Sequence, residues 1–150
     1  MRLRTTTLLA VLVLAPVAAQ AQDKKADQAA KKVSAVLAEF NGELREYERE
    51  LKYFQRVPEA ASLLELRRQL VEQAAAMNTL TSSGRGSGPA VLQLAKDMDR
   101  VSRKLDVTTG ELERRAKAVS KEGDRVVAAR MKGHSDSLVK AIDKVIVMFR

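Results

Sequence analysis

The chain has 150 residues, a length that suits one domain, and it contains neither cysteine nor tryptophan. Without cysteine, disulfides and the covalent attachment of lipid or haem through sulfur are excluded. Lysine and arginine number 27 against 19 aspartate and glutamate, a formal net charge of +8 that favours encounters with anionic surfaces without choosing among them.

The first 21 residues have the composition of a secretory signal peptide. Arg2 and Arg4 precede an apolar run from Leu8 to Val17, and small residues flank a cleavage point after Ala21. The apolar run is shorter than the roughly 20 residues that a transmembrane helix requires. We therefore expect the signal peptide to be removed, leaving a mature helical domain at 22–150 in the periplasm or outside the cell.

The strongest pattern in the chain is an apolar stripe that begins at residue 26. Its members follow one another at alternating steps of four and three residues: Ala26, Ala30, Val33, Leu37, Phe40, Leu44, Tyr47, Leu51 and Phe54. This spacing averages about 3.5 residues, so all of these side chains share one side of an α-helix. We predict a helix over about 24–56, ended by Pro58, which disfavours helical geometry at the preceding residue and has no N–H to donate.

A second helix is predicted over about 59–80, because Pro58 suits the first turn of a helix, where an N–H has no partner. Its stripe comprises Leu63, Leu66, Leu70, Met77 and Leu80, widened by Leu64, Val71 and Ala74. A tight turn at Val57–Pro58 makes the first two helices an antiparallel hairpin. The segment 81–89 contains three glycines and a proline, which predicts a flexible connection; no Gly-Lys-Ser/Thr follows that would indicate a phosphate-binding loop.

The third and fourth helices are predicted over about 90–121 and 124–149, with a turn at Gly123–Asp124. The third stripe comprises Val91, Leu94, Met98, Val101, Leu105, Leu112 and Val119. The fourth comprises Val127, Met131, His134, Leu138, Ile142, Val145 and Phe149. Thr108–Gly110 lies in the poorest helix-forming part of the third helix, so we expect a kink or a one-turn break there.

Four amphipathic helices without a candidate strand pair predict an all-α fold, an antiparallel four-helix bundle with coiled-coil-like packing. Each helix alone would be marginally stable in water. Burial of each large apolar side chain contributes roughly 1.5 to 3 kcal/mol, so the bundle forms only if the stripes meet.

The most regular polar feature is a row of acids beside the first stripe: Glu39, Glu43, Glu46 and Glu50. Bundles that bind two iron ions use glutamates on facing helices, but they also need Glu-x-x-His motifs on two of them. Here Met131 stands three residues before the single histidine. We therefore expect no metal site, and predict that the acids pair with bases of the third helix, as flanking positions do in coiled coils. Those bases are Arg100, Arg103, Arg114, Lys117 and Lys121.

His134 is the one candidate for a haem ligand, since exported four-helix bundles can hold haem between a histidine and a methionine. The mature first helix contains no methionine. Ser135 and Asp136 complete the residue types of a hydrolase triad, but neighbours on one helix cannot converge on a substrate. We expect neither a cofactor nor catalysis.

The remaining candidates are bases that suit contact with a partner or an anion: Arg114, Lys117, Lys121, Lys140 and Lys144. Acids interleave with the bases of the third helix and stacking aromatics are scarce, so we expect no nucleic-acid binding. We predict an exported, non-catalytic bundle that binds proteins, as a scaffold or chaperone-like partner of envelope or secreted proteins or of a second copy. The alternatives are a haem- or metal-carrying bundle, and a binder of anionic lipid or wall polymer through the third and fourth helices.

Overall fold

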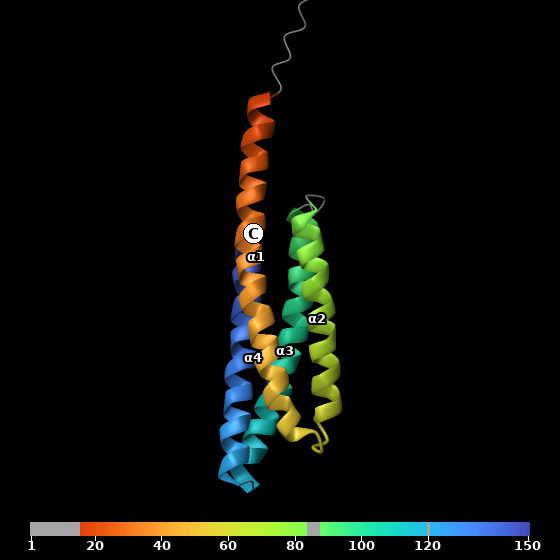
Figure 1. The fold of residues 1–150 in the computed structure, drawn as a ribbon, viewed down its shortest axis with the longest axis vertical. Helices are drawn as coiled ribbons and strands as arrows, with labels where there is room; N and C mark the ends of the chain where they lie inside the picture. Colours follow the sequence, from red (N-terminus) through yellow and green to blue (C-terminus); the bar gives the residue numbers. More distant parts are fainter. Residues whose placement is uncertain (1–15, 84–87, 120) are drawn as a thin grey trace, which may run out of the picture.

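The computed structural model describes residues 16–83, 88–119 and 121–150. These residues form four α-helices, one short 3-10 helix and no strand: α1 (Pro16–Leu51), η1 (Lys52–Phe54), α2 (Ala60–Ser82), α3 (Gly88–Val119) and α4 (Glu122–Met148). The predicted all-α four-helix bundle is confirmed (Figure 1). Most of the predicted signal peptide and the centre of the glycine-rich connection, 1–15 and 84–87, lie outside the described residues.

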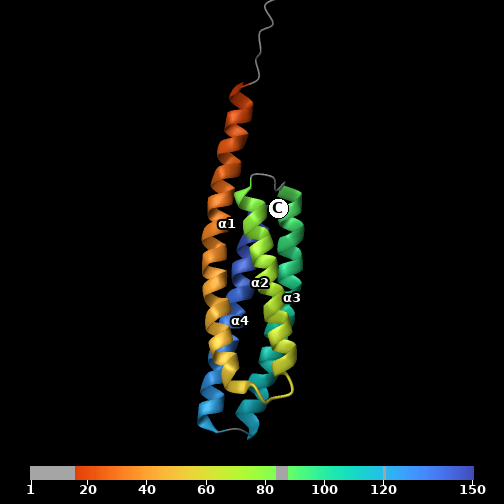
Figure 2. The same cartoon turned by 45° about the vertical axis from the view of Figure 1, so that its right-hand side comes forward.

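The helices follow one another around the bundle in chain order, and α4 packs against α1 to close the ring (Figures 1 and 2). Consequently α1 and α3 stand on one diagonal of the bundle, and α2 and α4 on the other. The N-terminal part of α1 projects beyond the ends of the other three helices (Figure 1). None of the described helices is both long enough and apolar enough to cross a membrane.

The core confirms the first predicted stripe from Val33 to Phe54, every predicted member of which is buried. The side chain of Ala26 lies outside the described part. In α2 the stripe is narrower than predicted, because Leu64 and Val71 are 47% and 40% exposed. The sequence pattern therefore located the inner face of the helix but overestimated its width.

The buried face of α3 differs from the predicted stripe at alternate positions. It comprises Val91, Ala95, Met98, Ser102, Leu105, Thr109, Leu112 and Ala116. Four of its members are small and follow one another at steps of seven residues: Ala95, Ser102, Thr109 and Ala116. The predicted member Val119 is instead 80% exposed. The small Thr109 leaves room at the bundle centre for Tyr47 of α1, whose hydroxyl lies 2.7 Å from that of the threonine.

The break predicted at Thr108–Gly110 is wrong, because α3 continues through these residues. The hydroxyl of Thr108 donates to the carbonyl of Lys104 at 2.9 Å, and that of Thr109 donates to the carbonyl of Leu105 at 2.7 Å. Each threonine therefore satisfies its hydroxyl within the helix, and Thr109 is also buried in the core. Tertiary contact outweighs the low intrinsic helix propensity of the segment.

The turn between α3 and α4 comes just before Gly123–Asp124 rather than at these residues. Lys121 has extended backbone, with φ −62° and ψ 158°, and α4 begins at Glu122. Acidic side chains in the first turn suit the positive end of the helix dipole. A Cβ atom at Gly123 would lie 3.2 Å from the Tyr53 hydroxyl, so glycine lets the α1–α2 connection approach α4 closely.

Candidate functional site

The predicted row of acids lies along the seam between α1 and α4. Glu39 forms an ion pair with Lys144 at 3.2 Å, and the carboxylate of Glu43 lies 2.6 Å from Nδ1 of His134. Glu50 accepts two hydrogen bonds from Arg130, at 2.9 and 3.1 Å. Glu46 instead pairs with Arg49 of its own helix at 3.2 Å. The predicted pairing with the third helix is wrong, because α1 and α3 are diagonal rather than adjacent.

Four of the five bases predicted to meet these acids, all except Lys121, have partners elsewhere. Arg100 and Lys117 bind Asp97 and Glu113 of their own helix, at 3.7 and 2.7 Å. Arg103 binds Asp99 of α3 at 2.9 Å and Asp143 of α4 at 3.1 Å. Arg114 donates to the carbonyl of Gly110 at 3.4 Å. The charged flanks of α3 thus stabilise α3 itself and its contact with α4.

No group of three or more histidine, aspartate or glutamate side chains in the described residues is arranged to hold a metal ion. His134 is partly buried, with 25% of its side chain exposed, and its Nδ1 lies on the Glu43 carboxylate. The other ring nitrogen forms no hydrogen bond within the described residues, and Met131, the nearest methionine along α4, is buried in the core. The observed role of His134 is to join α4 to α1.

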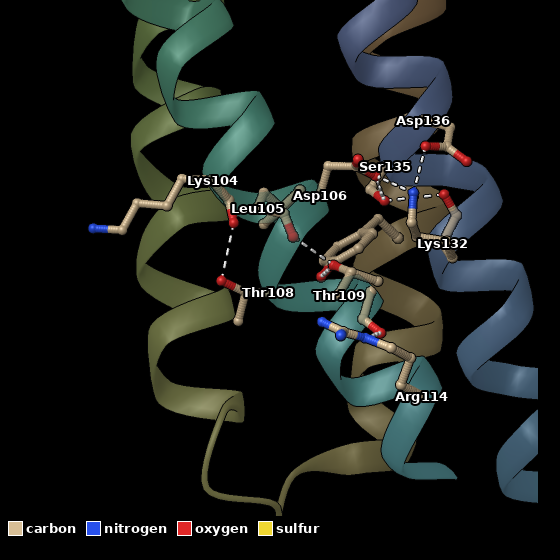
Figure 3. A network of polar contacts seen from close by, with 11 residues as sticks. Lys104, Leu105, Asp106, Thr108, Thr109, Arg114, Lys132, Ser135 and Asp136 are labelled. Atoms are coloured by element: carbon tan, nitrogen blue, oxygen red, sulfur yellow. Dashed lines mark hydrogen bonds and ion pairs between the residues drawn. The ribbon is translucent and has the colours of Figure 1, made fainter. Parts of the chain in front are cut away.

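A polar network joins α3 to α4 in the middle of the bundle (Figure 3). The carboxylate of Asp106 accepts from Lys132 Nζ at 2.9 Å and from Ser135 Oγ at 2.6 Å. Lys132 also donates to Asp136 at 2.5 Å. Ser135 is completely buried.

The network holds its carboxylate and its amine in their charged forms. Burial alone would raise the pKa of Asp106, but hydrogen bonds from Lys132 and Ser135 outweigh it and lower that pKa below 3.8. Burial would likewise lower the pKa of Lys132, but its bonds to Asp106 and Asp136 raise that pKa above 10.5. A protonated Lys132 cannot act as a base that accepts the hydroxyl proton of Ser135. The observed role of the network is therefore to join α3 to α4.

The residues Gly133-His134-Ser135-Asp136 do not form a catalytic constellation. The imidazole of His134 is directed to Glu43 of α1, whereas the hydroxyl of Ser135 is directed to Asp106 of α3. The two side chains therefore point toward different helices. This agrees with the argument that neighbouring positions on one helix cannot converge.

Two cavities lie along the seam between α1 and α2, and we call the surface that they form the α1–α2 groove. One has a volume of about 420 Å³ and is lined by Ser34, Leu37, Ala38, Asn41, Val71, Ala74, Ala75 and Asn78. The other has a volume of about 320 Å³ and is lined by Glu48, Leu51, Lys52, Gln55, Ala60 and Leu64. A salt bridge of 2.7 Å between Glu48 and Arg67 joins the two helices.

A further cavity of about 380 Å³, here called the end cavity, opens between the α1–α2 connection, the C-terminal part of α3 and the first turn of α4. It is lined by Lys52, Tyr53, Phe54, Gln55, Arg56, Val57, Leu112, Arg115, Ala116 and Asp124. Sequence reasoning missed both this cavity and the groove. For the groove a signal existed, because Leu64 and Val71 made the second stripe wider than one buried face.

The predicted basic candidates do not form one surface. Lys121 lies just before α4, and Lys140 lies about 28 Å farther along that helix, at 1.5 Å per residue. Lys117 and Lys144 are already paired with Glu113 and Glu39. Within the described residues, the exposed Lys121 and Lys140 side chains have no ion-pair partner. Comparisons with protein-family models, with curated proteins and with solved structures found no match.

Proposed function

We propose that this protein is an exported, non-catalytic helical bundle that binds another protein. The α1–α2 groove is the binding surface, and its occupant is an amphipathic helix of an envelope or secreted partner. The observation that carries the proposal is the exposure of Leu64 and Val71 beside the cavities along this seam. Large apolar side chains exposed next to a concave surface are typical of helix-in-groove recognition.

The dimensions of the groove suit a third helix. Leu64 and Val71 are seven residues apart, which is about 10 Å along α2 and matches one heptad of a partner helix. Ser34 and Ala38 of α1 and Ala75 of α2 are small, so a ridge of large aliphatic side chains can approach the backbone closely.

The 420 Å³ cavity of the groove favours an apolar occupant. All eight residues that line its 420 Å³ cavity are uncharged. Burying an unpaired charge there would cost free energy without a compensating partner, so a charged peptide face is disfavoured. The side chains of Asp106, Lys132 and Ser135 in the polar network, by contrast, already bind one another, which supports binding over catalysis as the function.

The experiment is site-specific photo-crosslinking in the native host, with the photoreactive residue at Ala75 in the groove. The matched control carries it at Lys104, which is exposed on α3 and points away from the polar network (Figure 3). We expect an adduct at position 75 that maps by mass spectrometry to the apolar face of a partner helix. The adduct should be absent at position 104 and lost in the double variant Leu64→Gln, Val71→Gln.

Two results would overturn this assignment. Equal adducts at both positions would show that the groove is not selective. An adduct between two copies of this chain would replace the partner helix by a homodimer. Export is checked separately, because the predicted cleavage makes Gln22 the first residue of the protein isolated from the periplasm or the medium.

A further inference from the structure

The end cavity combines an apolar floor with a basic rim. Phe54, Leu112 and Ala116 are buried and line the floor. Tyr53 donates to Asp124 at 2.8 Å, and this bond joins the α1–α2 connection to the first turn of α4 on one side of the cavity. The apolar and charged groups therefore come from segments far apart in the sequence.

The charges around the cavity are not balanced. Arg115 pairs with Glu59, and the carboxylate of Asp124 accepts from Tyr53. Lys52 and Arg56 are exposed, and no acid among the described residues forms an ion pair with either. Two cations without an ion-pair partner in the described residues thus stand at the rim of a cavity that has apolar side chains at its floor within a mixed polar and apolar lining.

We propose that the end cavity binds a small carboxylate with a short apolar body, such as a medium-chain fatty acid. The carboxylate accepts from Arg56 and Lys52, and the chain packs against Phe54, Leu112 and Ala116. Guanidinium groups bind carboxylates with two parallel hydrogen bonds, and burial of the chain adds the apolar contribution. The volume of about 380 Å³ lies within the range of small-molecule sites.

The test is calorimetric titration of the full mature chain with decanoate below its micellar concentration, at low salt. Decanol and acetate are the probes that lack the charge and the chain, respectively. We expect saturable 1:1 binding of decanoate and much weaker binding of the other two. Amide chemical-shift changes should be confined to 52–57, 112–116 and the start of α4.

The deciding variant is Lys52→Gln with Arg56→Gln, which should weaken decanoate binding roughly tenfold or more, since hydrogen bonds to charged groups are among the stronger ones. The matched control is Lys104→Gln with Lys140→Gln, which removes the same charge from exposed positions elsewhere and should leave the affinity unchanged. Thermal melts confirm that both double variants fold.

Several outcomes would overturn the proposal. Equal binding of decanol and decanoate would remove the role of the basic rim. Chemical-shift changes around the 420 Å³ cavity of the α1–α2 groove would place the binding site there instead. Tighter binding of decyl phosphate than of decanoate would show that the carboxylate is the wrong head group. The proposal does not depend on a partner helix, although Lys52 and Gln55 line both the end cavity and the 320 Å³ cavity of the groove.

Discussion

Among the described residues, three serine and threonine side chains, Ser102, Thr109 and Ser135, are completely buried in the core, and their hydrogen bonds differ. Thr109 lies 2.7 Å from both the Tyr47 hydroxyl and the Leu105 carbonyl. A carbonyl only accepts, so the single hydroxyl proton of Thr109 is directed to Leu105, and Tyr47 must donate to Thr109. The hydroxyl of Ser102 has no partner among the described residues.

This assignment predicts unequal effects for two conservative substitutions. Thr109→Val removes the acceptor of the buried Tyr47 hydroxyl, so we expect a loss of about 1 to 3 kcal/mol of unfolding free energy. Tyr47→Phe leaves Thr109 bound to the Leu105 carbonyl and should cost only about 0.5 to 1.5 kcal/mol. Urea unfolding measures both, with Ser102→Ala as a control that should cost little. Equal losses for Thr109→Val and Tyr47→Phe would contradict the assigned donor.

The same residue predicts a loss of stability at alkaline pH. Burial raises the pKa of Tyr47 above its ordinary value of 10.0, so above pH 10 the unfolded chain ionises while the folded one does not. The raised pKa of Lys132 acts in the same direction, because its stabilisation is lost as the pH rises from 10.5 through the folded-state pKa. The lowered pKa of Asp106 contributes stability above pH 3.8 that is lost in acid.

Unfolding free energies should therefore be highest between about pH 4 and pH 10 and fall on either side. The measurement is a series of urea unfolding curves from pH 8 to pH 12. Tyr47→Phe should decline less steeply above pH 10 than the unchanged protein, by up to about 1.4 kcal/mol per pH unit. Identical alkaline slopes would show that the phenol is not shielded.

At the scale of helices, the stripes predicted which segments are helical, because apolar side chains recur with the helical period. They did not predict the continuity of α3, since the low propensity of Thr108–Gly110 is overcome by the hydrogen bonds and burial of Thr109. They also chose Val101 and Val119 for the core instead of Ser102 and Ala116. The size and hydrophobicity of a residue in α3 cannot show that a large side chain from α1, such as Tyr47, fills the space beside it.

Two mid-helix glycines offer a further test of the elements. An added Cβ at Gly42 in α1 or at Gly133 in α4 would meet no atom within 4 Å. Alanine loses less backbone entropy than glycine on folding, so Gly42→Ala and Gly133→Ala should each raise the unfolding free energy by up to about 1 kcal/mol. Gly123→Ala is the matched control, and it should gain less because its Cβ would lie 3.2 Å from the Tyr53 hydroxyl. Thermal melts compare the three; a loss for Gly42→Ala would contradict the open surface around it.

For the whole molecule, the class of fold followed from the sequence, but the order of neighbours around the bundle did not. The acids of α1 were correctly placed beside the stripe and assigned to the wrong partner helix. Bases flank both α3 and α4, so charge complementarity could not choose between them. The exported location is predicted from the composition of residues 1–21 and the binding role from the exposed groove, and both stay predictions.

The pair Glu50–Arg130 tests how the α1–α4 seam contributes to the arrangement. Arg130→Glu sets two carboxylates side by side and should destabilise the bundle by about 1 kcal/mol, while the exchange Glu50→Arg with Arg130→Glu should recover most of that loss. A double-mutant cycle measured by urea unfolding isolates the coupling. The exposed pair Arg100–Asp97, at 3.7 Å, is the control and should show weaker coupling. Strict additivity at Glu50 and Arg130 would mean that the seam does not depend on this pair.

The hydroxyl contact between Tyr47 and Thr109 runs across the diagonal of the bundle, and it therefore ties one helical hairpin to the other. Parting the hairpins would expose these groups together with the apolar layers around them, whereas fraying of the projecting start of α1 would disturb neither. The backbone amides around Tyr47 and Thr109 should accordingly be the last to exchange their hydrogens, doing so only through complete unfolding. A helix bound between α1 and α2 binds only the folded protein and should therefore slow this exchange further.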